Sequence, residues 1–126
     1  MDKTRKDRNK KGNNLHVSTT TAGQLFDFVV DSFKRESDVS SAKMFGATGL
    51  RKGAKFFAML YKGNLVVKLP AERVEELVKS KKGKPFDPGH GRIMKEWVAI
   101  EPSGNKQEWL ALAQEASRFV ASRRQD

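Results

Sequence analysis

The sequence predicts an α+β domain in which an antiparallel β-sheet of about four or five strands is flanked by an N-terminal and a C-terminal helix. Two segments near the ends of the chain repeat apolar residues with the helical period of about 3.6 residues. Short apolar segments separated by glycines lie between them, as in strands that are joined by tight turns. A length of 126 residues favours a single domain with its own hydrophobic core.

The two terminal helices are predicted from capping residues that are followed by apolar stripes. The first helix begins within Ser18–Thr21, whose hydroxyl groups can accept hydrogen bonds from free amides, and its stripe covers Ala22–Phe33. The last helix follows Asn105, which forms a capping-box pattern with Glu108. Its stripe covers Trp109–Val120, and we expect both apolar stripes to pack against the sheet.

The predicted strands differ in how apolar they are. Val39–Phe45 is a short strand, and glycines break residues 46–54 into brief extended pieces. Lys55–Tyr61 is a nearly continuous apolar run, which indicates a central strand with both faces at least partly covered. The strands Leu65–Leu69 and Met94–Ile100 complete the sheet.

Prolines and glycines mark the connections between these elements. Pro70 begins a middle helix. The first N–H groups of a helix have no partner within it, so proline, which lacks an N–H group, loses no hydrogen bond at this position. We expect Gly83 to be the left-handed residue that follows this helix. Lys84–Arg92 contains two prolines and two glycines, which predicts a loop, and Lys62–Gly63–Asn64 is a compact hairpin connection.

The charge of the chain is unevenly distributed. The net charge is +10, from 25 Lys and Arg residues against 15 Asp and Glu residues. Residues 1–17 hold six of the bases and two of the acids, and we expect them to form a disordered basic tail ahead of a domain over residues 18–126. The chain has no cysteine and no apolar run of the roughly 20 residues that span a bilayer. We therefore expect a cytoplasmic protein that does not enter a membrane.

Patterns typical of catalysis or cofactor binding are missing from the sequence. The glycines of residues 46–53 match neither a Walker loop nor a dinucleotide-binding fingerprint. His16 and His90, the two histidines of the chain, come without the further ligands that a zinc site needs. Glu75 and Glu76 are neighbours on a helix and therefore point in different directions. We expect no catalytic residue, no cofactor and no metal, and hence no enzyme.

A series of short motifs resembles the N-terminal domain of the TfoX (Sxy) family, which is associated with regulation of natural competence in bacteria. The motifs are Met44–Phe45–Gly46, Gly49–Leu50, Gly53 with Lys55, Phe57 and Ala58, then Leu65, Lys68, Pro85–Phe86, Met94 and Trp97. The resemblance covers about residues 26–120 and implies a sandwich-like domain in which terminal helices flank an antiparallel sheet. Competence regulators of this type also have a helical C-terminal domain. Because the sequence ends at Asp126, the resemblance implies a stand-alone, single-domain member.

Two hypotheses for function follow. The first is a non-enzymatic regulatory or adaptor module that binds a partner protein, as the resemblance implies, through an exposed sheet edge or the face around residues 46–55. The second is sequence-independent nucleic-acid binding through the basic tail and clusters of lysines. We expect Phe45 to pack inward, with Gly46 forming a turn, and we leave open whether the protein is a monomer or a homodimer. The candidate interaction residues are Gly46, Gly49, Arg51, Lys52, Lys55, Lys81, Lys82, Lys84, His90 and Arg92.

Overall fold

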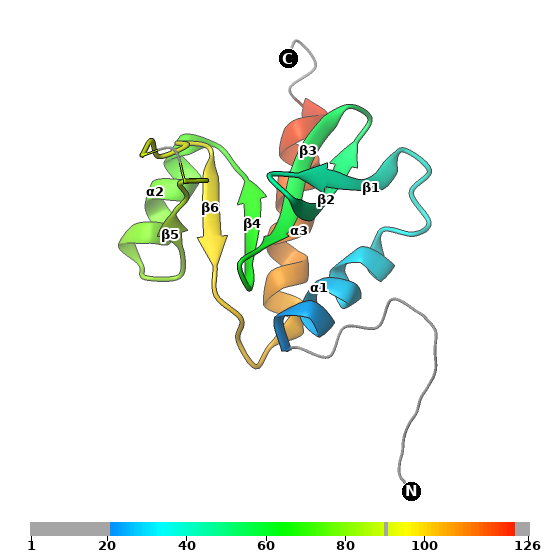
Figure 1. Ribbon diagram of the computed structural model, residues 1–126, viewed down its shortest axis with the longest axis horizontal. Coiled ribbons are helices and arrows are strands. Elements are labelled where there is room, and N and C mark those ends of the chain that lie inside the picture. The colour runs from blue at the N-terminus through cyan, green and yellow to red at the C-terminus, as the bar shows by residue number, and fades with distance from the viewer. Residues whose placement is uncertain (1–20, 90, 123–126) are drawn as a thin grey trace, which may run out of the picture.

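The computed structural model describes residues 21–89 and 91–122, within which three helices and six strands are formed (Figure 1). The predicted tail, the beginning of the first helix before Thr21, and His90 lie outside the described residues. The elements are, in chain order, α1 (Thr21–Ser32), β1 (Val39–Met44), β2 (Ala47–Lys52), β3 (Lys55–Tyr61), β4 (Asn64–Lys68), α2 (Ala71–Lys79), β5 (Lys84–Pro85), β6 (Trp97–Ile100) and α3 (Lys106–Ser122).

The six strands form one antiparallel sheet in the order β1-β2-β3-β4-β6-β5. This confirms the predicted α+β class, but the sheet has one strand more than the four or five that we expected. The additional strand is β5, in which Lys84 pairs with Ala99 and Pro85 pairs with Val98 of β6. Lys84–Arg92 was predicted to be a loop, because it is rich in proline and glycine and because a strand of two residues has no recognisable sequence pattern.

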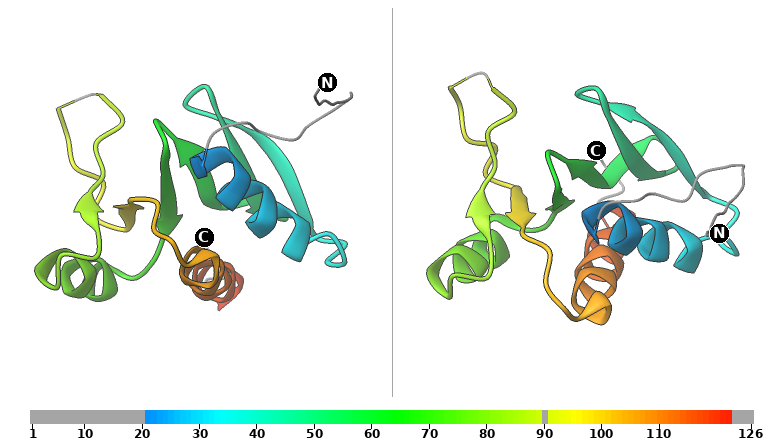
Figure 2. Two further views of the ribbon diagram at one scale, coloured as in Figure 1. Left: turned by 90° about the horizontal axis from the view of Figure 1, so that it is seen from below. Right: turned by 60° about the horizontal axis from the view of Figure 1, so that its bottom comes forward.

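The helices pack on one face of the sheet and enclose the main core. Figure 2 (left) shows α1, α2 and α3 on one side, whereas the β1–β2 turn and the segment between β5 and β6 project to the other. Phe57 of β3 and Trp109 of α3 are fully buried in this core. The indole Nε1 of Trp109 donates a hydrogen bond to the carbonyl oxygen of Glu101, which satisfies the polar atom of this large buried side chain.

The opposite face of the sheet carries a second, smaller core without any helix. We call it the helix-free face. Its buried residues are Met59, Val66, Phe86, Trp97 and Ala99, and its partly buried residues are Met44, Ala47, Phe56, Tyr61 and Met94. Both faces of β3 and β4 are covered, which for β3 confirms the prediction from its continuous apolar sequence. A register shift opposite Leu50 and Arg51 places Phe57 in the main core, although Met59, two residues further on, lies on the helix-free face.

Two helix ends show where local sequence signals were right and where they were not. Asn105 caps α3, since its Oδ1 accepts a hydrogen bond from the Gln107 N–H at 3.0 Å. The end of α2 differs from the prediction, because Lys81 and not Gly83 is the left-handed residue, with φ at 64°. The Lys82 N–H donates to the Leu77 carbonyl at 2.9 Å, which is the Schellman arrangement.

Close packing against β6, and not a left-handed backbone, explains the glycine at position 83. A Cβ atom at this position would lie 2.6 Å from Val98 Cγ2 and 3.1 Å from Ile100 Cδ1. The backbone of residue 83 therefore passes directly over two side chains of β6, and only a glycine allows this close approach. The contact brings the following residues, Lys84 and Pro85, alongside β6 as strand β5.

Candidate functional site

The β1–β2 turn presents an aromatic side chain at the tip of the hairpin. Phe45 and Gly46 both have positive φ, at 53° and 76°, as the two central residues of a type I′ turn do. Phe45 is 43% exposed. Our expectation that it packs inward is therefore wrong, whereas Gly46 forms the turn as predicted. A phenylalanine is rarely found in the left-handed region, because its Cβ is crowded there.

An aromatic cluster joins this turn to the segment between β5 and β6. The ring of Phe86 lies 6.2 Å from that of Phe45 and 5.3 Å from that of Tyr61, in an edge-to-face arrangement with the latter. The Tyr61 hydroxyl donates to the carbonyl oxygen of Pro88 at 3.3 Å. Ile93 of the same segment is 56% exposed. The two segments that project from the helix-free face therefore meet through buried Phe86 and leave Phe45 and Ile93 open to solvent.

A hollow of about 370 Å³ opens beside this cluster, near the start of β3 and the end of β4. The ammonium group of Lys68 lies 5.9 Å from the centre of the Trp97 ring, a cation–π contact. The hollow therefore combines apolar and aromatic walls with two cations, Lys55 and Lys68. Its lining residues are Met44, Ala54, Lys55, Phe56, Lys68, Met94, Trp97 and Val120. Among them only Lys55 was predicted as a site residue.

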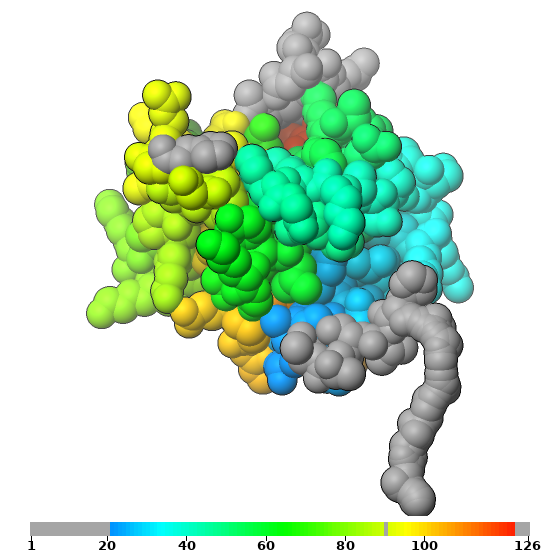
Figure 3. Space-filling view, viewed as in Figure 1, coloured from blue at the N-terminus to red at the C-terminus, as the bar shows by residue number. Residues whose placement is uncertain are grey.

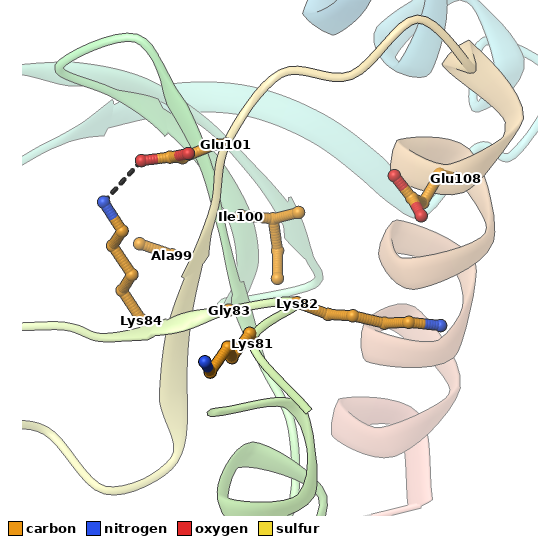
Figure 4. A pocket seen from close by; sticks show the side chains of 8 residues that line it. All are labelled: Lys81, Lys82, Gly83, Lys84, Ala99, Ile100, Glu101 and Glu108. Carbon is orange, nitrogen blue, oxygen red and sulfur yellow. Dashed lines mark hydrogen bonds and ion pairs between the residues drawn. The ribbon is translucent and has the colours of Figure 1, made fainter. Parts of the chain in front are cut away.

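A second hollow, of about 250 Å³, lies at the end of α2 and holds three of the predicted lysines (Figure 4). Figure 4 shows that Lys82 extends toward α3, while Lys84 forms an ion pair with Glu101. Glu108 of α3 also lines the hollow. The carboxylates partly offset the charge of the lysines, and the lysines point apart, so this hollow is a mixed-charge surface and not a concentrated anion site.

The predicted residues of β2 have separate roles. Gly49 is buried, and a Cβ there would lie 3.1 Å from the carbonyl oxygen of Ala58 and 3.2 Å from the ring of Phe56. The Nε of Arg51 donates a long hydrogen bond of 3.4 Å to the hydroxyl of Ser40. Gly49 is thus explained by close packing between strands, whereas Arg51 is exposed on the helix-free face.

Lys52 is held by two carboxylates at the beginning of β1. Its Nζ lies 3.1 Å from Asp38 Oδ2 and 3.3 Å from Glu36 Oε1. The hydrogen bond to Asp38, supported by the one to Glu36, raises the pKa of Lys52 above its usual value, against the opposing effect of burial. The charge of Lys52 is therefore engaged within the fold and is not free for a phosphate.

The nine candidate interaction residues that the structure describes do not form one surface. Strand β2, which carries Arg51 and Lys52, and strand β5, which begins at Lys84, are separated by β3, β4 and β6. Four strand spacings amount to about 19 Å of sheet width. Arg92 is exposed in the segment between β5 and β6. The residues therefore divide into a group near β2 and a group near β5, with the aromatic cluster between them.

Within residues 21–89 and 91–122, no group of three or more His, Asp or Glu side chains is placed to hold a metal ion. None of the described helices has the length and apolar character needed to cross a membrane.

An antiparallel sheet with three helices on one face and an aromatic, partly open opposite face defines the class: an α+β domain with a helix-free sheet surface. A family model described as TfoX N-terminal domain matches residues 31–120 of this chain. The chain belongs to that family, which confirms the resemblance seen in its sequence motifs. No curated protein matches the sequence.

Proposed function

We propose that this domain is a non-enzymatic regulatory or adaptor module that binds a partner protein with its helix-free face. The observation that carries the proposal is Phe45, a residue that combines a left-handed backbone with an exposure of 43%. Such a backbone costs on the order of 1–3 kcal/mol for a residue with a Cβ, and glycine or asparagine would avoid most of that cost. Packing against Phe86 covers part of the ring, and a contact outside the domain explains the part that remains exposed.

The surroundings of Phe45 indicate what kind of partner would fit. Phe45 and Ile93 offer apolar contact, and the neighbouring hollow has aromatic walls. Lys55 and Lys68 line the same hollow. We therefore propose a partner segment with an apolar anchor side chain and a nearby carboxylate, because buried aromatic contacts supply affinity and complementary charge supplies specificity.

Photocrosslinking at position 45 tests this proposal. A photoreactive phenylalanine analogue replaces Phe45 in living cells, and the matched control carries it at Glu75, an exposed residue of α2. We expect position 45 to yield a protein adduct that position 75 does not. The adducted protein is then purified, and Phe45→Asn, which suits the same turn, should weaken its binding by at least about tenfold. Equal adducts at both positions, or unchanged affinity of the variant, would refute the proposal.

Nucleic-acid binding is the second candidate, and the net charge of +10 favours it. Within the described residues, Lys52 and Lys84 are paired with carboxylates, which reduces the number of cations available for phosphates. A mobility-shift series across salt, with the full chain and with a chain lacking residues 1–14, tests this candidate. About four phosphate contacts would give a log–log salt slope near −3.6. Binding that does not weaken with salt, or no binding, would exclude the candidate.

A further inference from the structure

The two edges of the sheet are protected to very different degrees. Strand β5 forms one edge, and it is only two residues long and contains Pro85. Strand β1 forms the other edge over six residues, Val39–Met44, with Lys43 as its one charged side chain. Natural sheets usually shorten their edges or protect them with prolines and charges, because an open edge pairs with other strands. The β1 edge is therefore the better candidate for pairing with another chain.

The register of the β1–β2 hairpin shows which backbone groups face outward. Met44 pairs with Ala47 across the two-residue turn, so these two residues exchange hydrogen bonds with each other. Because the pattern alternates, the N–H and C=O groups of Ser41 and Lys43 point away from β2. No strand within residues 21–89 and 91–122 pairs with that outer side. At Val39 only the carbonyl group is available to another strand, because the Val39 N–H donates a hydrogen bond to the carbonyl oxygen of Glu36.

We propose that a second copy of this chain pairs with the first through β1, antiparallel, about a two-fold axis at Ser41. In this register Ser41 faces Ser41 of the second copy, and Lys43 faces Val39 of the second copy. A shift of the axis to Ala42 would bring the two copies of Lys43 to neighbouring positions on one face, where they repel each other. The small side chains of residues 40–42 allow the two strands to approach closely.

Charge complementarity supports this register. Val39 pairs with Lys52 inside the domain, and Lys52 binds Glu36 and Asp38. One cation and two carboxylates leave this cluster with a formal charge of −1. Lys43 of the second copy would lie beside Val39 and hence beside this cluster, and its charge would balance the cluster. The two-fold axis makes the same contact twice.

The proposed dimer has a consequence for the helix-free face. A two-fold axis perpendicular to the sheet joins the two sheets into one and keeps both helix-free faces on the same side. Both copies of Phe45 would then be displayed on that side. A strand pair of about five residues is smaller than a standard interface, so we expect association that is weak and depends on concentration.

Cysteine crosslinking tests the register directly, because the natural chain contains no cysteine. In the proposed dimer the Cα atoms of the two Ser41 residues are about 5.5 Å apart, within the range of a disulfide. Those of Ser40 are offset by two residues and lie about 8 Å apart, beyond that range. We expect Ser41→Cys to form a covalent dimer under mild oxidation at least about tenfold faster than the matched control Ser40→Cys. Equal rates would overturn the proposal.

Charge reversal provides the second test, with the mass measured by light scattering across concentration. We expect the natural chain to rise from 14.2 kDa toward twice that mass. Lys43→Glu should remain monomeric, and Lys43→Glu combined with Glu36→Lys should restore the dimer. The control Lys95→Glu makes the same charge change at an exposed site outside β1 and should not alter the mass. A natural chain that stays monomeric, or a dimer that survives Lys43→Glu, would overturn the proposal.

Discussion

Replacing Gly83 with alanine perturbs the place where the chain leaves α2 and joins β6. The added methyl group would lie 2.6 Å from Val98 Cγ2 and 3.1 Å from Ile100 Cδ1. Neither side chain can move aside easily, because Val98 is fully buried and Ile100 is only 3% exposed. The backbone of residues 83–85 must therefore shift away from β6, which disturbs the pairing of β5 with β6.

The expected size of the effect follows from two opposing contributions. Forcing an extra methyl group into a packed core typically costs about 1–3 kcal/mol. The lower flexibility of alanine in the unfolded chain returns about 0.4–1 kcal/mol. We therefore expect Gly83→Ala to lower the free energy of unfolding by about 1–2 kcal/mol, which for a domain of this size corresponds to a decrease in Tm of about 4–8 °C.

Urea unfolding followed by circular dichroism measures this difference, and Gly104→Ala is the matched control. A Cβ at Gly104 has no atom within 4 Å, and its φ lies outside the left-handed range. The control should be neutral or stabilised by up to about 1 kcal/mol. If Gly83→Ala is as stable as the natural chain, or if both variants shift equally, the proposed steric role of Gly83 is wrong.

Three further substitutions test other contacts, each by chemical denaturation. Phe45→Asn should be about 1 kcal/mol more stable than Phe45→Ala, because both lose the ring but only asparagine tolerates the left-handed turn; an equal or greater stability of the alanine variant would contradict this. The raised pKa of Lys52 means that its ion pairs stabilise the fold fully below the usual pKa of 10.5 and are lost as pH rises through the raised value. Lys52→Arg should therefore gain stability relative to the natural chain as the pH rises above about 10.5, and a stability difference that stays the same as at about pH 9 would refute the assignment. Arg73 donates from Nε and Nη2 to Glu115 at 2.9 and 3.3 Å, so Arg73→Lys should cost about 0.5–1 kcal/mol, and this cost should vanish in a Glu115→Gln background.

The main features of the fold could be predicted because they depend on apolar periodicity. The stripe of α1 buries Phe26 and Val29, and the continuous run of β3 buries Phe57 and Met59 on opposite faces of the sheet. Strand β5 could not be predicted, because two residues carry no period. It forms through contacts between Gly83 and β6, which are distant from each other in the sequence.

The candidate site was predicted less completely, because charge clusters mark sequence neighbours and not neighbours in space. Lys52 and Lys84 were assigned to an interaction surface, yet the fold supplies each with a carboxylate from another element. Trp97 was predicted to lie in a strand. The sequence did not indicate that the face of the sheet on which Trp97 lies would carry no helix. The hollow around it is lined by residues that are far apart in the sequence, from Met44 of β1 to Val120 of α3, and no local pattern encodes how these residues come together.

Among the residues that the structure describes, three other than glycine have a left-handed backbone, and the explanation for Phe45 differs from that for the other two. Lys62 and Lys81 also have positive φ, at 51° and 64°, in a hairpin turn and at the end of α2. Both residues are exposed, and the ammonium group of Lys62 lies 5.4 Å from the centre of the Tyr61 ring, so neither presents an apolar side chain to solvent. Pairing of the strands and the Schellman hydrogen bonds account for their backbone conformations. Phe45 bears the same backbone cost and in addition exposes an apolar ring beside Phe86. Since the turn alone would be better served by asparagine, the ring itself must account for the choice, and this directs the search for a partner to the helix-free face.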